Sequence, residues 1–461
     1  MYTLVVGLGK TGLSVVRYLR ALGEAVVVVD SRDIPPGLNT LQDSFSEVEY
    51  HTGKFEEALF LNAHRIIVSP GVAISEPVLL AARRNNIEII GDIDLFAHEV
   101  NAPVIGITGS NGKSTVTTLL AEMATQAGIN TVASGNIGTP VLDSLSEEAR
   151  LYVLELSSFQ LETLHRLPMK AAVVLNISAD HLDRYENLAA YAASKQAIYD
   201  NAAVQVINKD DALAVRMAGQ VPGQVSGHAA NDGQSVDRSL PEQRFFTLGQ
   251  PQEDEFGVCG EAEVKKLCLG RQALMGVDEL KIKGRHNIQN ALAALALGSA
   301  AGLPMDAMIA ALKSFKGLEH RTQFVAEIDG VNWINDSKAT NVGAAISALT
   351  GLPGKHILIA GGEGKGADFS ELTDVVKQHC HAVVLMGKDA DKIAQVLPEG
   401  LPMVKVDDMS SAVAAAKQLA DSLASKGDNV LLAPACASFD MFDNFEQRGD
   451  VFVKAVEALQ S

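Results

Sequence analysis

The sequence has few cysteines and no long apolar run. Its 461 residues include four cysteines, Cys259, Cys268, Cys380 and Cys436, and no two of them form a C-x-x-C pair. This spacing argues against a zinc knuckle or a disulfide framework, so we expect reduced thiols. No apolar run reaches the roughly 18 residues of a membrane span, and residues 1–10 lack a basic leader. We therefore expect no membrane insertion, no signal peptide and a cytoplasmic location.

Basic residues are fewer than acidic residues. Lys and Arg number 38 against 56 Asp and Glu, which gives a formal net charge of −18 at pH 7. Such a chain has no general attraction for nucleic acid or an acidic membrane, and we expect neither as a partner. A polyanionic ligand must then be held by local N–H groups, Lys, Arg or a metal ion. The length itself predicts roughly two to four domains.

The clearest chemical signal is Thr-Gly-Ser-Asn-Gly-Lys-Ser-Thr at residues 108–115. It follows an apolar run and precedes a run with helical periodicity, which predicts strand, loop and helix. Glycines let backbone N–H groups turn toward one anion, Lys113 reaches outer phosphates, and Ser114 or Thr115 can bind Mg²⁺. The general pattern G-x-x-x-x-G-K-[ST] fails, because Ile107 occupies its first glycine position. We nevertheless predict a nucleoside triphosphate site.

Residues 3–30 predict a βαβ unit with the turn Gly7-x-Gly9-x-x-Gly12. The helix is expected to end near Gly23, and a second strand ends in Asp30, where dinucleotide folds place the acid that binds a ribose hydroxyl. Taken alone, this pattern indicates NAD. A further strand at 65–68 ends in Ser69-Pro70-Gly71, which is either a ligand-binding turn or a simple loop.

Charged residues follow two strands of the second domain. Glu155 ends the apolar run 151–154 and is either a metal ligand or a solvated acid. Asp180-His181-Leu182-Asp183-Arg184 follows the expected strand 171–176, and its histidine is either a functional group or a surface residue. Lys195 lies in an alanine-rich segment, 191–200, that we expect to be one helix. Nothing local distinguishes this lysine from a solvated one.

The rest of the chain predicts further α/β structure. Residues 219–260 favour surface loops and short strands. A helix begins near Gly284, and Asn287 and Asn290 either cap it or contact a nucleotide. After a linker at 314–317 we expect a second parallel sheet, with strands near 331–335, 356–360, 382–386 and 429–433. The loop around Lys365 lacks the hydroxyl of a phosphate loop and is better suited to an organic anion.

These elements predict an α/β protein of three domains. Residues 1–94 form a Rossmann-like N-terminal domain, 95–315 a central ATPase-type domain with the phosphate loop, and 316–461 a Rossmann-like C-terminal domain.

The ordered motifs of the whole chain resemble the ATP-dependent Mur ligases of peptidoglycan synthesis. The family has its own variant of the phosphate loop, which accounts for the failed general pattern at 108–115. Within the family, 336–341 and 434–438 look like the D-glutamate-adding members, and the Asp-Asn-Pro-Arg motif of diaminopimelate-adding members is not present. The other matching motifs are Gly135-Asn136-Ile137-Gly138, Glu155-Leu156-Ser157-Ser158-Phe159-Gln160, Asp180-His181-Leu182-Asp183-Arg184, His286-Asn287 and His320-Arg321.

The resemblance implies amide formation between D-glutamate and UDP-N-acetylmuramoyl-L-alanine through an acyl phosphate, driven by ATP. It assigns UDP, and not NAD, to the first domain. The implied ATP contacts are Gly109, Ser110, Asn111, Gly112, Lys113, Ser114, Thr115, Asn287, Asn290, Arg321 and Asp336. The implied UDP-sugar contacts are Gly9, Thr11, Gly12, Asp30, Ser31, Arg32, Ser69, Gly71, Asn136, Ser157 and Gln160. The implied D-glutamate contacts are Thr340, Lys365, Ser438 and Phe445.

The resemblance also implies two metal sites and a catalytic set. Ser114 and Glu155 would hold an ATP-side Mg²⁺, and His181 with a carbamylated Lys195 would help to hold a second ion, Mg²⁺ or Mn²⁺. The catalytic residues would be Lys113, His181, Lys195 and Lys338. We expect a monomer whose third domain closes onto the central one.

Two alternative functions share parts of this pattern. A folylpolyglutamate-synthetase-like ligase has the same phosphate loop but lacks an N-terminal nucleotide domain. An NAD-dependent oxidoreductase with an accessory ATPase, or a UDP-sugar sensor without catalysis, would use the first domain differently.

Overall fold

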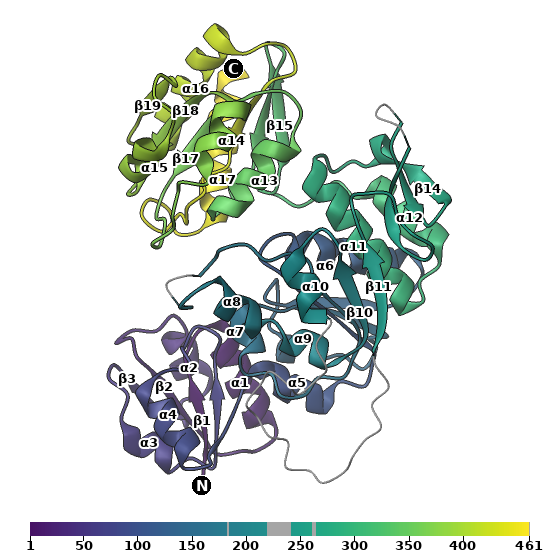
Figure 1. The fold of residues 1–461 in the computed structure, drawn as a ribbon. Helices are drawn as coiled ribbons and strands as arrows, with labels where there is room; N and C mark the ends of the chain where they lie inside the picture. The colour runs from purple at the N-terminus through teal and green to yellow at the C-terminus, as the bar shows by residue number, and fades with distance from the viewer. Residues whose placement is uncertain (182–183, 219–240, 261–263, 461) are drawn as a thin grey trace.

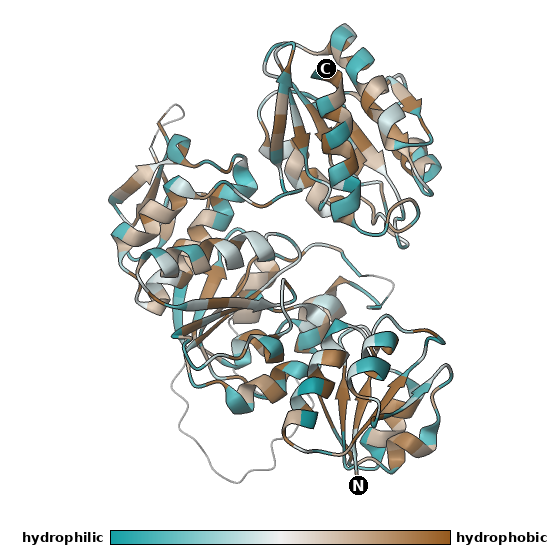
Figure 2. Ribbon diagram, turned by 180° about the vertical axis from the view of Figure 1, so that it is seen from behind, coloured by the Kyte–Doolittle hydropathy of each residue, from teal (hydrophilic) through white to brown (hydrophobic). Residues whose placement is uncertain are grey.

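The computed structural model describes residues 1–181, 184–218, 241–260 and 264–460. Each of three successive parts of the chain is built on its own sheet flanked by helices, which confirms the predicted three-domain α/β class. The C-terminal domain lies at the opposite end of the molecule from the N-terminal one, with the central domain between them (Figure 1). The strands are mostly apolar and lie in the interior of each domain, whereas polar residues are found on the surrounding helices (Figure 2). Among the described residues, no helix is long and apolar enough to cross a membrane.

The first domain is a parallel five-stranded sheet in the order β3-β2-β1-β4-β5. The predicted βαβ unit is confirmed, and the third glycine of its turn has a packing role. A Cβ on Gly12 would lie 1.9 Å from the carbonyl oxygen of Gly7. The elements are β1 (Thr3–Val6), α1 (Lys10–Ala21), β2 (Val26–Asp30), α2 (Leu38–Ser44), β3 (Glu49–Thr52), α3 (Glu57–Leu61), β4 (Arg65–Val68), α4 (Pro77–Arg84), β5 (Glu88–Ile90) and α5 (Asp92–Glu99).

The central domain has a nine-stranded sheet in the order β14-β13-β12-β11-β10-β9-β6-β8-β7. Its strands are parallel except for the hairpins at one edge, where β13 runs antiparallel to both β12 and β14. Its strands are β6 (Val104–Thr108), β7 (Thr131–Gly135), β8 (Leu151–Glu155), β9 (Met169–Val174), β10 (Ala202–Asn208), β11 (Glu242–Phe246), β12 (Phe256–Cys259), β13 (Lys266–Leu269) and β14 (Gln272–Gly276). Its helices are α6 (Lys113–Gln126), η1 (Val141–Ser144), α7 (Ser158–Leu161), α8 (Leu188–Ser194), α9 (Ala197–Asp200), α10 (Ala212–Ala218), η2 (Val277–Glu279), α11 (Arg285–Ala301) and α12 (Met305–Ser314).

The third domain is a six-stranded sheet in the order β15-β16-β20-β17-β18-β19. The four predicted strands are present, and the sheet is parallel except for the edge strand β15, which was not predicted. The elements are β15 (Gln323–Ile328), β16 (Val331–Asn335), α13 (Val342–Gly351), β17 (His356–Gly361), α14 (Leu372–His379), β18 (Cys380–Met386), α15 (Ala390–Val396), β19 (Met403–Lys405), α16 (Met409–Leu423), β20 (Asn429–Leu432), α17 (Phe445–Glu457) and η3 (Ala458–Gln460).

Two local expectations are corrected, one about a helix and one about a pair of cysteines. The single helix expected at 191–200 is broken into α8 and α9, with Lys195 at the end of α8. Of the segment 219–260, residues 219–240 lie outside the described part; the expected short strands are present as β11 and β12, which belong to the central sheet and bury Phe246 and Phe256.

The thiol expectation is wrong for one pair of cysteines. Cys259 and Cys268 form a disulfide across β12 and β13, with their Cα atoms 6.2 Å apart. The hairpin brings together two residues that are nine positions apart in sequence, a pairing that no local pattern indicates. Cys380 and Cys436 are free and buried.

The apolar cores differ in how they join the domains. One continuous cluster runs from the first domain into the central one, where the rings of Phe96 and Tyr152 meet edge to face at 5.1 Å. The third domain has two clusters of its own, on the two faces of its sheet. Burial therefore ties the first two domains together more firmly than it ties the third to either.

Candidate active site

The phosphate loop lies between β6 and α6, as the sequence predicts. Gly109 and Gly112 have positive φ angles of 148° and 87°, which a side chain would strain. Lys113 folds back across the loop and donates from Nζ to the carbonyl oxygens of Gly109 (2.8 Å) and Ser110 (3.0 Å). Burial lowers its pKa. Lys113 therefore stabilises the conformation of the phosphate loop through these two hydrogen bonds.

The segment after β9 braces this loop. Asn176 accepts from the backbone N–H of Asn111 at 2.9 Å and donates to its carbonyl oxygen at 3.0 Å. The N–H of Ser178 donates to Ser110 Oγ at 2.9 Å. Neither Asn176 nor Ser178 was expected at the site from the sequence. Their position just after a parallel strand adjacent to β6 was the signal that could have found them.

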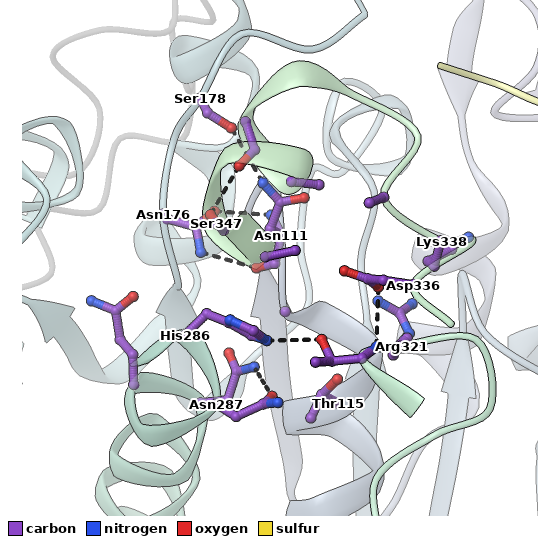
Figure 3. A pocket seen from close by; sticks show the side chains of 18 residues that line it. Asn111, Thr115, Asn176, Ser178, His286, Asn287, Arg321, Asp336, Lys338 and Ser347 are labelled. Atoms are coloured by element: carbon purple, nitrogen blue, oxygen red, sulfur yellow. Dashed lines mark hydrogen bonds between the residues drawn. The ribbon is translucent and has the colours of Figure 1, made fainter. Parts of the chain in front are cut away.

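A cavity of about 200 Å³ opens between the loop and the third domain (Figure 3). Among the residues expected at ATP, Asn111, Gly112, Thr115, Asn287, Asn290, Arg321 and Asp336 line it, together with Lys338. Further lining residues that the sequence analysis did not assign to ATP are Asn176, Ser178, His286, Gln289, Thr322 and Ser347. The structure thus brings residues from two domains to one cavity.

The two asparagines of α11 face this cavity and do not cap the helix. The helix begins after Gly284, which provides no side-chain cap. Asn287 Nδ2 donates to Lys283 O at 2.8 Å, and Asn290 Nδ2 donates to Asn287 Oδ1 at 3.1 Å. The capping alternative is therefore wrong. A Cβ on Gly112 would lie only 2.4 Å from Asn290 Oδ1, so α11 packs directly against the phosphate loop.

Charged groups of the third domain reach across the cavity. Arg321 donates from Nη2 to Ser114 Oγ at 2.6 Å. Burial lowers the pKa of Arg321 and lowers that of Lys338 to about 8. Burial raises the pKa of Asp336 to about 6, although its Oδ1 accepts from the N–H of Thr322 at 3.2 Å. These shifts reflect charges gathered in a poorly hydrated site.

Glu155 has one satisfied and one orphaned carboxylate oxygen. It is 3% exposed, and Asn136 Nδ2 donates to its Oε1 at 2.8 Å. Oε2 is buried and accepts no hydrogen bond from the described residues. A buried carboxylate oxygen without a partner is costly, and a divalent cation would satisfy it. The described residues contain no group of three His, Cys, Asp or Glu arranged for a metal, so phosphate or other ligand oxygens would have to complete such a site.

Lys195 is buried beside the phosphate loop. It is 1% exposed, and its Nζ lies 3.3 Å from Thr108 Oγ1, 3.4 Å from Gly109 O and 4.6 Å from the ring centre of Tyr191. Burial, followed by repulsion from Lys113, lowers its pKa well below the usual value. Burial therefore favours the uncharged form of this amine over a solvated cation.

His181 stands at the same edge in a left-handed turn with φ of 54°. Its Nε2 lies 3.9 Å from the carboxylate of Asp180, and its ring meets Phe159 at 4.7 Å. Asp180 Oδ2 also accepts from Asn341 of the third domain at 3.2 Å. Of the sequence motif at 180–184, residues 182 and 183 lie outside the described part.

The residues expected at UDP lie at the carboxyl edge of the first sheet. Gly9, Thr11 and Gly12 follow β1, Ser31 and Arg32 follow β2, and Ser69 and Gly71 follow β4. Asp30 is 3% exposed and accepts from the N–H of Leu8 (2.7 Å) and from the guanidinium of Arg32 (2.6 Å). Its carboxylate therefore orders the glycine turn and holds Arg32 in place.

The residues expected at the muramoyl arm have structural partners. Ser157 and Gln160 form a capping box at the start of α7, with both reciprocal hydrogen bonds present. Asn136 is held by Glu155, as described above. Their contact with a substrate stays a prediction.

Two of the residues expected at D-glutamate, Phe445 and Lys365, each belong to a cation–aromatic pair with a residue that was not expected there. Lys338 Nζ lies 3.8 Å from the ring centre of Phe445, and Lys365 Nζ lies 5.3 Å from that of Phe439. Phe439 is 63% exposed and was not predicted. Ser438 is buried, and the N–H of Thr340 donates to Lys338 O at 2.8 Å. The role of these residues also stays a prediction.

Comparison with family models gives three matches in chain order. Residues 1–91 match the Mur ligase MurD-like N-terminal domain, residues 107–298 the Mur ligase middle domain, and residues 320–436 the glutamate ligase domain of Mur ligases. The chain belongs to the Mur ligase family. The cavity beside the phosphate loop is lined by residues of both the matched middle domain and the matched glutamate ligase domain.

Curated Mur ligases align with the full chain. UDP-N-acetylmuramoylalanine–D-glutamate ligase of Nitrosococcus oceani is 50% identical over 462 residues, which cover 100% of this chain and 97% of the relative. The enzyme of the same name from Pseudomonas aeruginosa is 48% identical over 463 residues, covering 99% and 98%.

Solved structures share the fold. A pseudomurein peptide ligase type C from Methanothermus fervidus aligns with a TM-score of 0.59 at 19% identity, and covers 100% of both chains. UDP-N-acetylmuramate-alanine ligase from Thermotoga maritima aligns with a TM-score of 0.58 at 18% identity, also over 100% of both chains.

Proposed function

We propose that this Mur ligase is an ATP-dependent enzyme that joins D-glutamate to UDP-N-acetylmuramoyl-L-alanine through an acyl phosphate, in the cytoplasmic part of peptidoglycan synthesis. One observation carries the proposal. A phosphate loop with its lysine, a buried carboxylate with an orphaned oxygen and three charged groups of the third domain surround one interdomain site. The names of the relatives at 48–50% identity supply the choice of substrates.

The chemistry begins with two anions that must meet. A carboxylate oxygen of the L-alanyl group attacks the γ-phosphorus of ATP, and the bond from that phosphorus to the β-phosphate oxygen breaks to release ADP. Lys113 lies in the phosphate loop, and Arg321 and Lys338 face it from the third domain. These cations reduce the repulsion between the reactants and stabilise the charge on the transferring phosphoryl group.

Glu155 and Ser114 are the residues that would hold the ATP-side Mg²⁺, and the orphaned Oε2 fits that role. When bound, the ion would supply positive charge to the phosphate oxygens. His181 and Lys195 would help to hold a second Mg²⁺ or Mn²⁺.

A carbamate on Lys195 would make it a ligand for that second ion. The neutral amine attacks the carbon of carbon dioxide and forms an N–C bond, and one N–H proton leaves to solvent. The product is a carbamate, whose anionic oxygens, in place of the amine nitrogen, are then available as ligands. Burial of Lys195 favours this step, because the uncharged amine is the form that reacts. The burial of Lys195 thus supports its carbamylation, which the sequence suggested only through the family resemblance.

The second half of the reaction is aminolysis. The amine of D-glutamate attacks the acyl carbon, the bond to the phosphate oxygen breaks, inorganic phosphate leaves and the nitrogen loses a proton. The third domain would present D-glutamate from Thr340, Lys365, Ser438 and Phe445. Lys338 next to Phe445 would place positive charge near the amino-acid carboxylates.

Domain limits, closure and assembly complete the proposal. We place the boundaries near residue 94, within α5, and after residue 315. The third domain keeps its own cores and would close onto the central domain when ligands fill the cavity. We also propose that the protein acts as a monomer.

One assay tests the function. The purified protein receives UDP-N-acetylmuramoyl-L-alanine and Mg-ATP, and phosphate release is measured with D-glutamate, L-glutamate or diaminopimelate. Release only with D-glutamate is expected. Release that is the same with or without an amino acid refutes the ligase, and release with L-glutamate and a pterin substrate indicates the folylpolyglutamate type. Binding of NADH in place of UDP would indicate an oxidoreductase.

A further inference from the structure

Arg184 bridges the first and central domains. Its guanidinium donates to the carbonyl oxygens of Pro70 (2.9 Å) and Val72 (3.0 Å) and to Glu162 Oε2 (2.8 Å). The side chains of Arg184 and Glu162 are 15% and 10% exposed. The planar guanidinium satisfies these three acceptors at fixed angles, whereas the compact ammonium of a lysine could not span them.

The loop that Arg184 holds follows β4 and is hydrogen-bonded to the start of the glycine turn of the first domain. The N–H of Ser69 donates to Val6 O (2.9 Å), and Ser69 Oγ donates to Gly7 O (3.0 Å). The N–H of Val72 donates in turn to Ser69 O (3.0 Å). These hydrogen bonds therefore couple the position of the loop at 69–72 to that of the glycine turn, where we place the UDP diphosphate.

Arg184 also contacts the support of His181. Its guanidinium carbon lies 4.1 Å from the ring centre of Phe159, and that ring meets the imidazole of His181 at 4.7 Å between centroids. The backbone N–H of Arg184 donates to His181 O at 2.9 Å. A single side chain thus touches both the UDP loop and the aromatic ring that orients the histidine.

We propose that Arg184 is a positioning residue that couples binding of the UDP group to the orientation of His181. The inference rests on the proposed function, because it assigns UDP to the first domain. A ligand that orders the loop at 69–72 fixes the two carbonyl oxygens to which Arg184 donates. Arg184 then holds the ring of Phe159, which restricts the orientations of the His181 imidazole. Binding energy from the remote nucleotide is then used to organise the group beside the reacting carboxylate.

Hydrogen exchange with UDP alone is the decisive experiment. In the natural protein, UDP is expected to protect amides at 69–72 and also amides around His181. In Arg184→Met, which keeps the length of the side chain and removes its donors, UDP is expected to protect only the first domain. Equal protection around His181 in both proteins overturns the proposal. If UDP fails to bind the natural protein, the UDP assignment itself is wrong, so the two failures are distinguishable.

Steady-state kinetics give a second readout. Arg184→Met is expected to raise KM for the sugar nucleotide about tenfold and to lower kcat, whereas KM for ATP and for D-glutamate stays within about twofold. Arg184→Lys keeps the charge and is expected to lie between the two; it also serves if the methionine variant does not fold.

Arg17→Ala is the matched control. Arg17 pairs with Asp143 and so also joins the first and central domains, but this pair contacts neither the loop nor Phe159. It is expected to leave KM, kcat and the UDP-induced protection unchanged. An equal loss in Arg17→Ala would show that any weakened domain contact gives the effect, and would overturn a specific role for Arg184.

Discussion

The buried carboxylate of Asp336 is expected to cost folding stability at neutral pH. It is 9% exposed, and burial raises its pKa from 3.8 to about 6. At about 1.4 kcal/mol per pKa unit, this difference corresponds to about 3 kcal/mol. Asp336→Asn removes the charge and keeps an oxygen that accepts from Thr322. The variant is therefore expected to be more stable than the natural protein by up to about 3 kcal/mol at pH 7.

The sign of the pH dependence follows from proton binding. Between pH 3.8 and about 6 the folded state binds more protons at this position than the unfolded state. Stability is therefore lost as pH rises through that window, and the natural protein and the variant should be equally stable below it. The advantage of Asp336→Asn should grow from about pH 4 and level off above about pH 6.

Trp333 provides the assay for this prediction. It is the single tryptophan of the chain, is 0% exposed and lies on β16 just before Asp336, so its fluorescence reports the third domain. Urea unfolding followed by this signal is compared for both proteins at several pH values. A stability difference that does not change with pH refutes the reasoning.

Asp92→Asn is the control for that experiment. Burial also raises the pKa of Asp92 to about 6, but this residue begins α5 in the first domain. It is expected to leave the Trp333 transition and KM for ATP unchanged. By contrast, Asp336→Asn should raise KM for ATP, because Asp336 lines the cavity.

Three further predictions concern the metal and nucleotide sites. Lys195→Ala is expected to lose activity and to regain part of it with bicarbonate or a short-chain carboxylate; full activity without either contradicts a ligand role. Glu155→Gln keeps the bond to Asn136 but removes the charge, so a Mg²⁺ titration should show a requirement raised at least about tenfold, and an unchanged titration curve argues against Glu155 as a ligand. Gly12→Ala places a Cβ 1.9 Å from Gly7 O and should destabilise the fold by about 1–3 kcal/mol; UDP binding measured by calorimetry should weaken, and unaltered binding would exclude this turn as the UDP site.

Much of the candidate site could be predicted because parallel strands end at a common edge. The phosphate loop, Glu155 and His181 follow β6, β8 and β9, which are neighbours in the sheet. Strand patterns are local, so they could be recognised without knowing the fold. His286, Thr322 and Ser347 could not be assigned in this way, since each is a polar residue in a loop or helix with no distinguishing periodicity.

Other features depend on segments that meet only after folding. The disulfide between Cys259 and Cys268 needs a hairpin, and the edge strand β15 needs the pairing partner β16. Neither pairing leaves a signal in the short stretch of sequence that takes part in it.

The sequence by itself determined the three α/β domains, the phosphate loop with Lys113 and the family resemblance, because each depends on residues that are close in the chain. Only the tertiary structure decided the chemical state of Lys195 and Glu155. The pKa of Lys195 is lowered because the fold buries it beside Lys113, and Glu155 is left with an orphaned oxygen because Asn136 satisfies only one of its two carboxylate oxygens. Burial and neighbouring charge set these properties, and both come from parts of the chain that are distant in sequence.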